Sequence, residues 1–212
     1  MHVFIAGANG KIGRHLLQEM ADSDHEARAM IRDPDQGPEL QQLGATETVL
    51  GDLEQDCSEA MRGCGAVIFT AGSGPHTGPE KTVDVDQDGA IRLVDTARAM
   101  GIKRFILVSS MGAGEPEKGP EKLRHYLQAK HNADEHLKAS GLNYTIVRPG
   151  QLTNDNGTGK VTMTAGAEEF GKIPRQDVAR VLLAVLDSDN TANRVFGVVS
   201  GDTPVAEALT KL

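Results

Sequence analysis

Short apolar runs alternate with amphipathic stretches along the first 150 residues of the chain. The apolar runs predict strands over residues 2–6, 25–31, 46–50, 66–71, 104–109 and 144–147. Between them, apolar residues recur at helical spacing and predict helices over residues 11–21, 34–43, 55–62, 83–100 and 120–139. Strands that are apolar throughout and separated by helices pair in parallel, with helices on both faces. We therefore expect an α/β fold built on a doubly wound parallel sheet.

The pattern weakens after Pro149, where the predicted elements become shorter. A small strand over 161–164, a helix over 176–186 and a late strand over 195–199 are expected there. We expect residues 1–212 to form one domain, to which residues 150–212 contribute a minimal substrate cap.

Spaced glycines follow directly after the first expected strand. The turn consists of Gly7, Ala8, Asn9, Gly10, Lys11, Ile12 and Gly13. Gly7 permits a tight turn, Gly10 admits a diphosphate close to the backbone, and Gly13 lets the helix pack on the strand. The helix that begins near Lys11 offers free N–H groups and the positive end of its dipole. An ordinary strand-turn-helix is the alternative, but the position after the first strand favours a dinucleotide site.

The end of the second expected strand distinguishes the two nicotinamide dinucleotides. In such folds an acidic residue here bonds the 2′-hydroxyl of NAD, whereas an arginine accommodates the 2′-phosphate of NADP. Arg32 follows Gly13 by nineteen residues, close to the usual spacing of about twenty. Asp33 competes for the role, but it precedes Pro34 and suits a helix cap. A solvated surface charge is the other interpretation of Arg32, and we expect NADP in preference to NAD.

Tyr126 and Lys130 lie one helical turn apart on the helix expected after the fifth strand. Both fall on the apolar side of that helix, where an unpaired ammonium is costly. A lysine that snorkels beside a packed tyrosine is one interpretation of the pair. The other is proton transfer, in which the Tyr126 phenol serves a substrate oxygen and Lys130 stabilises it and holds the nicotinamide ribose.

Ser109 and Ser110 end the fifth expected strand, at the sheet edge where a nicotinamide should lie. We expect Ser110 to orient the substrate carbonyl or hydroxyl, and Ser109 to lie at the cofactor or to cap the strand end. The Gly- and Pro-rich segment 111–120 that follows is either a lid over the site or a surface loop.

Composition narrows the classes of partner. The net charge of −8 argues against binding to nucleic acids or anionic membranes. Cys57 and Cys64 form no metal or redox motif, and the first strand begins too early to leave room for a signal peptide. We therefore expect a cytoplasmic protein that acts on a small molecule, in an oligomeric state that the sequence does not define.

An acidic run over residues 84–89 superficially resembles a calcium-binding loop. The segment before it contains Gly and Pro and is not expected to be a helix, so half of such a motif is missing. Apolar residues at helical spacing follow the run, which favours acids at a helix start. We expect no metal site.

The chain as a whole resembles the short-chain dehydrogenase/reductase superfamily, in particular its atypical NAD(P)H-binding members related to NAD-dependent epimerase/dehydratases. The motifs that carry the resemblance are residues 7–13, Arg32-Asp33-Pro34, Gly51-Asp52-Leu53, Ala71-Gly72, Ser109-Ser110, Tyr126 with Lys130, and Arg148-Pro149-Gly150. The resemblance implies a Rossmann fold and covers essentially the whole chain. It also implies that Asp52 and Leu53 contact adenine, that Ala71 and Gly72 contact the ribose and diphosphate, and that Pro149 lies at the nicotinamide.

The expected function is an NADP-dependent oxidoreductase that acts on a small carbonyl or alcohol. The short segment after the sixth strand disfavours a large sugar-nucleotide substrate. Two alternatives stay open: a non-catalytic NADP(H)-binding sensor or regulator, and an epimerase or isomerase with a tightly held cofactor.

Overall fold

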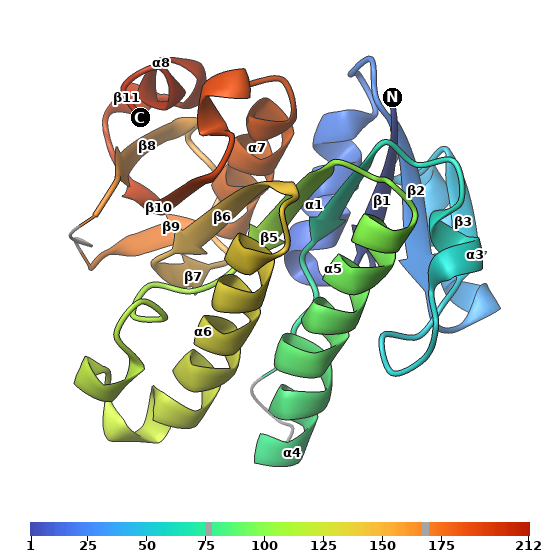
Figure 1. Ribbon diagram of the computed structural model, residues 1–212. Helices are drawn as coiled ribbons and strands as arrows, with labels where there is room; N and C mark the ends of the chain where they lie inside the picture. Colours follow the sequence, from blue (N-terminus) through green and yellow to red (C-terminus); the bar gives the residue numbers. More distant parts are fainter. Residues whose placement is uncertain (75–77, 167–169) are drawn as a thin grey trace.

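A nine-stranded sheet forms the centre of the computed structural model, which describes residues 1–74, 78–166 and 170–212 (Figure 1). The order of its strands is β11-β8-β10-β6-β5-β4-β1-β2-β3. The strands are β1 (His2–Ala6), β2 (Glu26–Ile31), β3 (Glu47–Leu50), β4 (Ala66–Phe69), β5 (Arg104–Val108), β6 (Asn143–Pro149), β7 (Gln151–Thr153), β8 (Lys160–Thr164), β9 (Lys172–Pro174), β10 (Arg194–Ser200) and β11 (Thr203–Pro204). From β10 to β3 all neighbours pair in parallel, whereas β8 runs antiparallel to β10 and β11. The parallel, doubly wound α/β fold expected from the sequence is confirmed.

Helices cover both faces of this sheet. They are α1 (Lys11–Met20), α2 (Gly37–Gln42), α3 (Ser58–Met61), α4 (Pro79–Thr82), α5 (Ala90–Ala99), α6 (Arg124–Ala139), α7 (Arg175–Leu186) and α8 (Val205–Leu209). Helices α5 and α6 lie side by side on one face, and α1 packs beside α7 on the other (Figure 1). Short 3₁₀ turns occur at Pro34–Gln36, Pro116–Lys118, Glu121–Leu123 and Asp189–Thr191, and a π-helical turn, η2, spans Val83–Gly89.

The side chains of β1 point alternately into two hydrophobic cores, one on each face of the sheet. Val3 and Ile5 pack with α1 and α7, whereas Phe4 and Ala6 pack with α3, α5 and α6. Successive side chains of a strand point to opposite faces, so a strand buried on both sides must be apolar at every position. This explains the continuous apolar run at the start of the chain.

Two expected helices are built differently from the prediction. The helix expected over 34–43 is a 3₁₀ turn followed by α2, because Asp33 caps a tight first turn. The helix expected over 83–100 begins earlier, as α4 at Pro79, and passes through η2 before α5. The acidic run is therefore helical and forms no loop.

Most of residues 150–212 belongs to the main layers of the fold. Strands β8, β10 and β11 extend the sheet, and α7 packs on α1. Among the described residues, β7 and β9 form a separate two-stranded sheet next to the end of β6. The minimal substrate cap expected over residues 150–212 stays a prediction.

The strands β1, β2, β4, β5 and β6 run in the same direction, so their carboxyl ends meet at one edge of the sheet. In open α/β sheets this edge is where ligands bind. Among the described residues, no helix combines the length and the apolar character needed to cross a bilayer.

Candidate active site

The glycine-rich turn connects β1 to α1 at the ligand edge of the sheet. Gly7 has a φ of +83°, and a Cβ there would lie 2.5 Å from the backbone nitrogen of Ala71. A Cβ on Gly13 would lie 2.3 Å from the carbonyl oxygen of Gly7. Both positions therefore require glycine for the close packing of β1, β4 and α1.

Gly10 is different, because it is exposed and less crowded than Gly7 and Gly13. The nearest atom to a Cβ there is the carbonyl oxygen of Gly7, at 3.1 Å, and the first turn of α1 receives no side-chain cap from Gly10. Uncapped N–H groups at a helix start bind anions, and a turn without a side chain admits a diphosphate. The residues present therefore fit a dinucleotide.

Arg32 and Asp33 have different environments at the end of β2. The side chain of Arg32 is exposed, and its backbone N–H donates to the Gln36 side chain at 3.4 Å. The Asp33 carboxylate accepts the backbone N–H of Asp35 at 3.0 Å and so caps the following 3₁₀ turn. The other arginine close to the glycine turn, Arg14, is paired with Glu39.

The residues after β3 and β4 surround the same edge. Asp52 is exposed and accepts the backbone N–H of Glu54 at 3.0 Å, while the Leu53 side chain is buried against Gly89. Ala71 is half-buried against Gly7 of the glycine turn, and Gly72 is exposed. The burial of Leu53 means that Asp52 is the more accessible of the two positions that the family resemblance assigns to adenine.

Tyr126 and Lys130 lie one turn apart near the start of α6. The Lys130 Nζ is 5.8 Å from the centre of the Tyr126 ring. Tyr126 is half-exposed, whereas the Lys130 side chain is only 3% exposed. The ammonium donates to the carbonyl oxygen of Val108, the last residue of β5, at 3.3 Å.

A buried carboxylate, Asp86, completes the surroundings of Lys130. Its Oδ1 lies 2.9 Å from the Lys130 Nζ, and its Oδ2 accepts the backbone N–H of Ser73 at 2.9 Å. Burial works to lower the pKa of the Lys130 ammonium, but Tyr126, Asp86 and Asp134 raise that pKa above its usual value overall. Asp86 was not singled out from the sequence, although a lysine on an apolar helix face does require a counter-ion.

Ser109 and Ser110 turn in different directions at the end of β5. Ser109 is buried, and its hydroxyl donates to the Asp134 carboxylate of α6 at 3.0 Å. Ser110 is half-exposed, and its hydroxyl donates to the Met111 carbonyl at 3.2 Å. The hydroxyl of Ser110 is therefore the more accessible of the two, and that of Ser109 serves the interior.

The Asp134 carboxylate is the centre of a second buried network. Its Oδ2 also accepts from the Nε and Nη2 of Arg148 in β6, at 3.1 and 2.9 Å. Burial raises the pKa of Asp134 above its usual value, although Arg148 and Ser109 act to lower it. The network joins β5, β6 and α6 directly below the ligand edge. The motif Arg148-Pro149-Gly150 pointed to this position, but not to Asp134.

The segment that follows Ser110 packs closely on α6. A Cβ on Gly114 would lie 2.6 Å from the Arg148 Nη1, and the carbonyl oxygen of Ala113 lies 2.9 Å from the His131 Nδ1. Pro149 is buried at the end of β6, where its carbonyl accepts the backbone N–H of Met111 at 3.1 Å. The residues around Ser110 are therefore held in place by several contacts.

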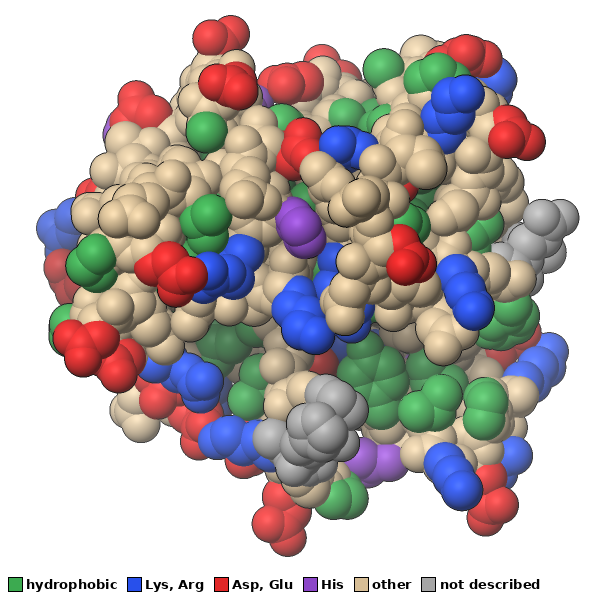
Figure 2. Space-filling model, turned by 180° about the vertical axis from the view of Figure 1, so that it is seen from behind, with side chains coloured by type: hydrophobic (Ala, Val, Ile, Leu, Met, Phe, Trp, Pro, Cys, Tyr) green, Lys and Arg blue, Asp and Glu red, His purple; other side chains and the backbone are tan. Residues whose placement is uncertain are grey.

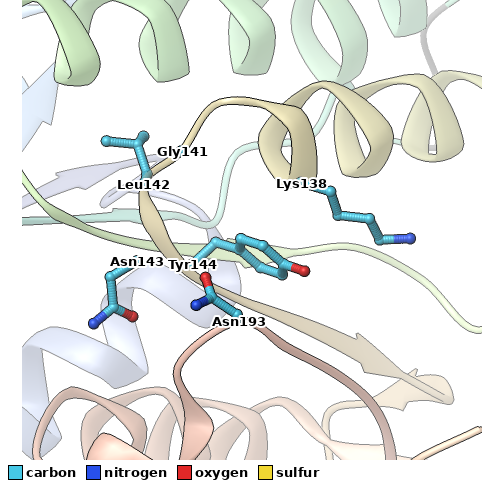
Figure 3. Close-up of a pocket in the computed structure, with 6 residues that line it drawn as sticks. All are labelled: Lys138, Gly141, Leu142, Asn143, Tyr144 and Asn193. Atoms are coloured by element: carbon cyan, nitrogen blue, oxygen red, sulfur yellow. The ribbon is translucent and has the colours of Figure 1, made fainter.

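The surface has a separate hollow of about 460 Å³ at the opposite edge of the sheet (Figure 3). It is lined by Lys138, Gly141, Leu142, Asn143, Tyr144 and Asn193, so it lies at the amino end of β6. Figure 3 shows the Tyr144 ring beside the Asn193 side chain, with Lys138 reaching out beyond them. None of the residues expected at the cofactor or substrate lines this hollow.

Fold and turn together define a dinucleotide-binding α/β protein of the Rossmann type. The sequence matches the NAD(P)H-binding family over residues 7–189, and the chain belongs to this family. It is 50% identical to the uncharacterized sugar epimerase YhfK of Bacillus subtilis, over all of both chains.

Solved structures agree with this assignment. A Bacillus halodurans protein, named provisionally as an NAD-dependent epimerase/dehydratase, is 48% identical over all of both chains, with a TM-score of 0.97. An anaerobillin reductase from Escherichia coli O157:H7 is 26% identical, with 95% of this chain and 98% of that chain covered and a TM-score of 0.82. The protein is thus an enzyme of the NAD(P)-dependent oxidoreductase and epimerase type.

Proposed function

We propose that the protein is an NADP-dependent reductase of a small carbonyl compound. The observation that carries the proposal is the pairing of a half-exposed Tyr126 with a buried, charged Lys130 at the carboxyl end of β5. A phenol that is accessible on one side and held beside an ammonium on the other is equipped to transfer a proton. Ser110 lies at the end of the same strand, where its hydroxyl can orient a carbonyl oxygen.

The preference for NADP rests on Arg32 and Asp33. The Oδ1 of Asp33 caps the following turn, which gives this carboxylate a structural role and favours Arg32 as the residue that selects the cofactor. The exposed guanidinium of Arg32 has the charge and geometry to pair with a 2′-phosphate. When bound, the nicotinamide supplies a hydride, which is the reducing equivalent of the reaction.

The remaining groups bind and orient. Gly7, Gly10 and Gly13 shape the diphosphate turn, and Ala71, which follows β4, packs against Gly7. Tyr126 gives its proton to the carbonyl oxygen of the substrate. Lys130 keeps a positive charge next to the phenol ring. A small substrate is supported by the sheet topology, because the described part of residues 150–212 mostly extends the main sheet and its helices, with β7 and β9 outside that sheet.

A related reductase supports this choice of reaction. The similar protein of Escherichia coli O157:H7 is named an anaerobillin reductase, whereas the Bacillus subtilis relative carries an epimerase name. An epimerase returns its hydride to the substrate and consumes no cofactor, while a sensor binds the cofactor without turnover. Net oxidation of NADPH therefore separates the three functions.

The test is a panel of small aldehydes, ketones, quinones and linear tetrapyrroles, assayed by the loss of NADPH absorbance with the parent protein. We expect oxidation of NADPH with at least one class, and its loss in the Tyr126→Phe variant. NADPH binding without oxidation across the panel would favour the sensor, and interconversion of sugar epimers without net oxidation would favour the epimerase. Either result would overturn the reductase proposal.

A further inference from the structure

Lys130 and Asp86 form a pair of opposite charges inside the protein. Their side chains are 3% and 1% exposed, and 2.9 Å separates the Nζ from the Oδ1. Removing one partner of a buried ion pair is strongly destabilising, because it leaves the other charge uncompensated. The proposed proton donor, Tyr126, therefore lies beside a neutral ion pair rather than beside an isolated ammonium.

The backbone around Asp86 is shaped to bring this carboxylate to Lys130. Asp86 lies in the π-helical turn η2, which interrupts the helix formed by α4 and α5. Such turns rotate side chains relative to an α-helix and occur often at functional sites. The same carboxylate accepts the N–H of Ser73, and Gly72 leaves room for it, with the Oδ1 only 3.2 Å from the position of a Cβ. Asp86 thus connects the loop after β4 to α6.

Among the described residues, Tyr126 and Asp134 also act on Lys130 from α6 itself, and β5 contributes the carbonyl of Val108. Asp134 is already paired with Arg148 of β6, which offsets its charge. Lys130 and Asp86 are therefore the pair of opposite charges that lies beside the Tyr126 ring.

We propose that Asp86 is a positioning residue that offsets the charge of Lys130 beside the Tyr126 ring, and so equips the site to reduce a carbonyl rather than to oxidise an alcohol. The inference rests on the proposed reductase function and adds a reason why the site reduces a carbonyl rather than oxidises an alcohol. A reduced nicotinamide would give up the hydride of its C–H bond to the carbonyl carbon and be oxidised; the electron pair of the C=O π bond would then move to oxygen, which would take the proton from the phenol O–H bond. The phenolate that remains regains a proton from water, which completes the balance. An isolated ammonium would instead favour the phenolate, which is the form needed to oxidise an alcohol.

The chain permits a direct measurement of this effect without any substrate. It contains two tyrosines and no tryptophan, so Tyr144→Phe leaves Tyr126 as the only phenol. In that background, the ultraviolet absorbance of the phenolate during a pH titration reports on Tyr126 alone. Asp86→Asn, Lys130→Met and the double variant are titrated in parallel, with Asp84→Asn as the matched acid-to-amide control on the same helical turn.

Opposite shifts are expected for the two single variants. Asp86→Asn leaves the ammonium without its counter-charge and should lower the titration midpoint of Tyr126 by about one pH unit or more. Lys130→Met leaves the carboxylate unpaired and should raise the midpoint. The double variant removes both charges and should return the midpoint to within about half a unit of the parent, whereas Asp84→Asn should not move it.

A structural role alone would not produce shifts of opposite sign that cancel. An unchanged or raised midpoint in Asp86→Asn would overturn the assignment, as would a double variant that differs from the parent by a full unit. The double variant contains no unpaired buried charge, so it stays measurable even if a single variant does not fold. The titration needs no substrate, so its failure would refute the role of Asp86 and leave the reductase assay as a separate test of the proposed function.

Discussion

Arg32 is the residue on which the cofactor preference depends. Its guanidinium is exposed at the end of β2, and Asp33 is occupied as a cap. NADPH should therefore bind at least tenfold more tightly than NADH, a difference of about 1.4 kcal/mol. Arg32→Asp should reverse the preference, because a carboxylate repels the 2′-phosphate and bonds the diol.

Titration calorimetry with both cofactors measures this preference directly. Arg98→Asp makes the same change of charge at an exposed position of α5 and should leave both affinities unchanged. Equal affinities of the parent protein for NADPH and NADH would contradict the role of Arg32.

Tyr126 should be needed for turnover but not for cofactor binding. Tyr126→Phe removes only the phenol oxygen and should lower kcat by about 10²- to 10⁴-fold on any substrate found, with the Kd for NADPH nearly unchanged. Tyr144→Phe removes the same atom at the opposite edge of the sheet and should have no effect on kcat. If the Tyr126→Phe variant turned over at the parent rate, Tyr126 would have no role in proton transfer, and the site would be one that only binds the cofactor.

The spacing of Tyr126 and Lys130 could be predicted from the sequence because both lie on one helix. Asp86 could not, because its contact with Lys130 depends on how η2 packs against α6, and no spacing along the chain encodes this. Ser109 and Ser110 show the same limit. Adjacent residues at a strand end turn to different sides, and the buried Asp134 that takes the Ser109 hydroxyl comes from a later helix.

At the level of elements, Gly10 and Gly13 have different roles where β1 connects to α1. A Cβ on Gly13 would overlap the Gly7 carbonyl, so Gly13→Ala should lower the free energy of unfolding by about 2 kcal/mol or more. At Gly10 the backbone is extended, with φ −74° and ψ 165°, and a Cβ meets its nearest atom at 3.1 Å. Gly10→Ala should therefore change the stability by less than about 1 kcal/mol but weaken NADPH binding at least tenfold.

Urea unfolding and calorimetry on both variants separate the two effects. Each variant serves as the control for the other, since both add one methyl group to the same turn. Loss of stability in Gly10→Ala comparable to that in Gly13→Ala would show that the turn has no space set aside for a ligand.

The acidic run in η2 should not respond to calcium. It is helical, and Asp86 within it is committed to Lys130 and Ser73. A ligand that binds only the native state at 100 times its Kd would stabilise the protein by about 2.7 kcal/mol. Millimolar calcium should leave the Tm unchanged in a thermal scan, with magnesium as the control. A rise in Tm specific to calcium would contradict the helical interpretation.

The strongly periodic elements of the sheet and its helices were predictable because burial on one or two faces determines their pattern. The short strands β7, β9 and β11 were not, since two or three residues are too few for a period to appear. The helix start at Pro79 was also missed. The preceding residues Gly74 and Gly78 suggested a loop, while Gly78 in fact is the N-cap position of α4.

At the level of the whole molecule, the charged interior gives stability a defined dependence on pH. The pKa of Lys130 is raised in the folded protein, so its contribution is complete below the pKa of an unfolded lysine, about 10.4. The contribution is lost as the pH rises through the higher pKa of the folded state. The difference in unfolding free energy between the parent and Lys130→Met should therefore be constant up to about pH 10 and decline above it.

Urea unfolding curves at closely spaced alkaline pH values measure this difference. Lys138→Met, at a partly exposed lysine on the same helix, is the matched control and should show no such decline. A difference between the parent and Lys130→Met that does not change with alkaline pH would mean that Lys130 is not charged in the native state.

The two margins of the sheet are unequally open to another strand. At one end the last strand, β11, is only two residues long and includes Pro204, which has no N–H to offer. At the other end β3 is four residues long and leaves Leu50 58% exposed. The β11 edge of the nine-stranded sheet therefore resists pairing with a strand from another molecule, and the β3 edge resists it less. We expect any edge-to-edge association of this sheet to start from β3.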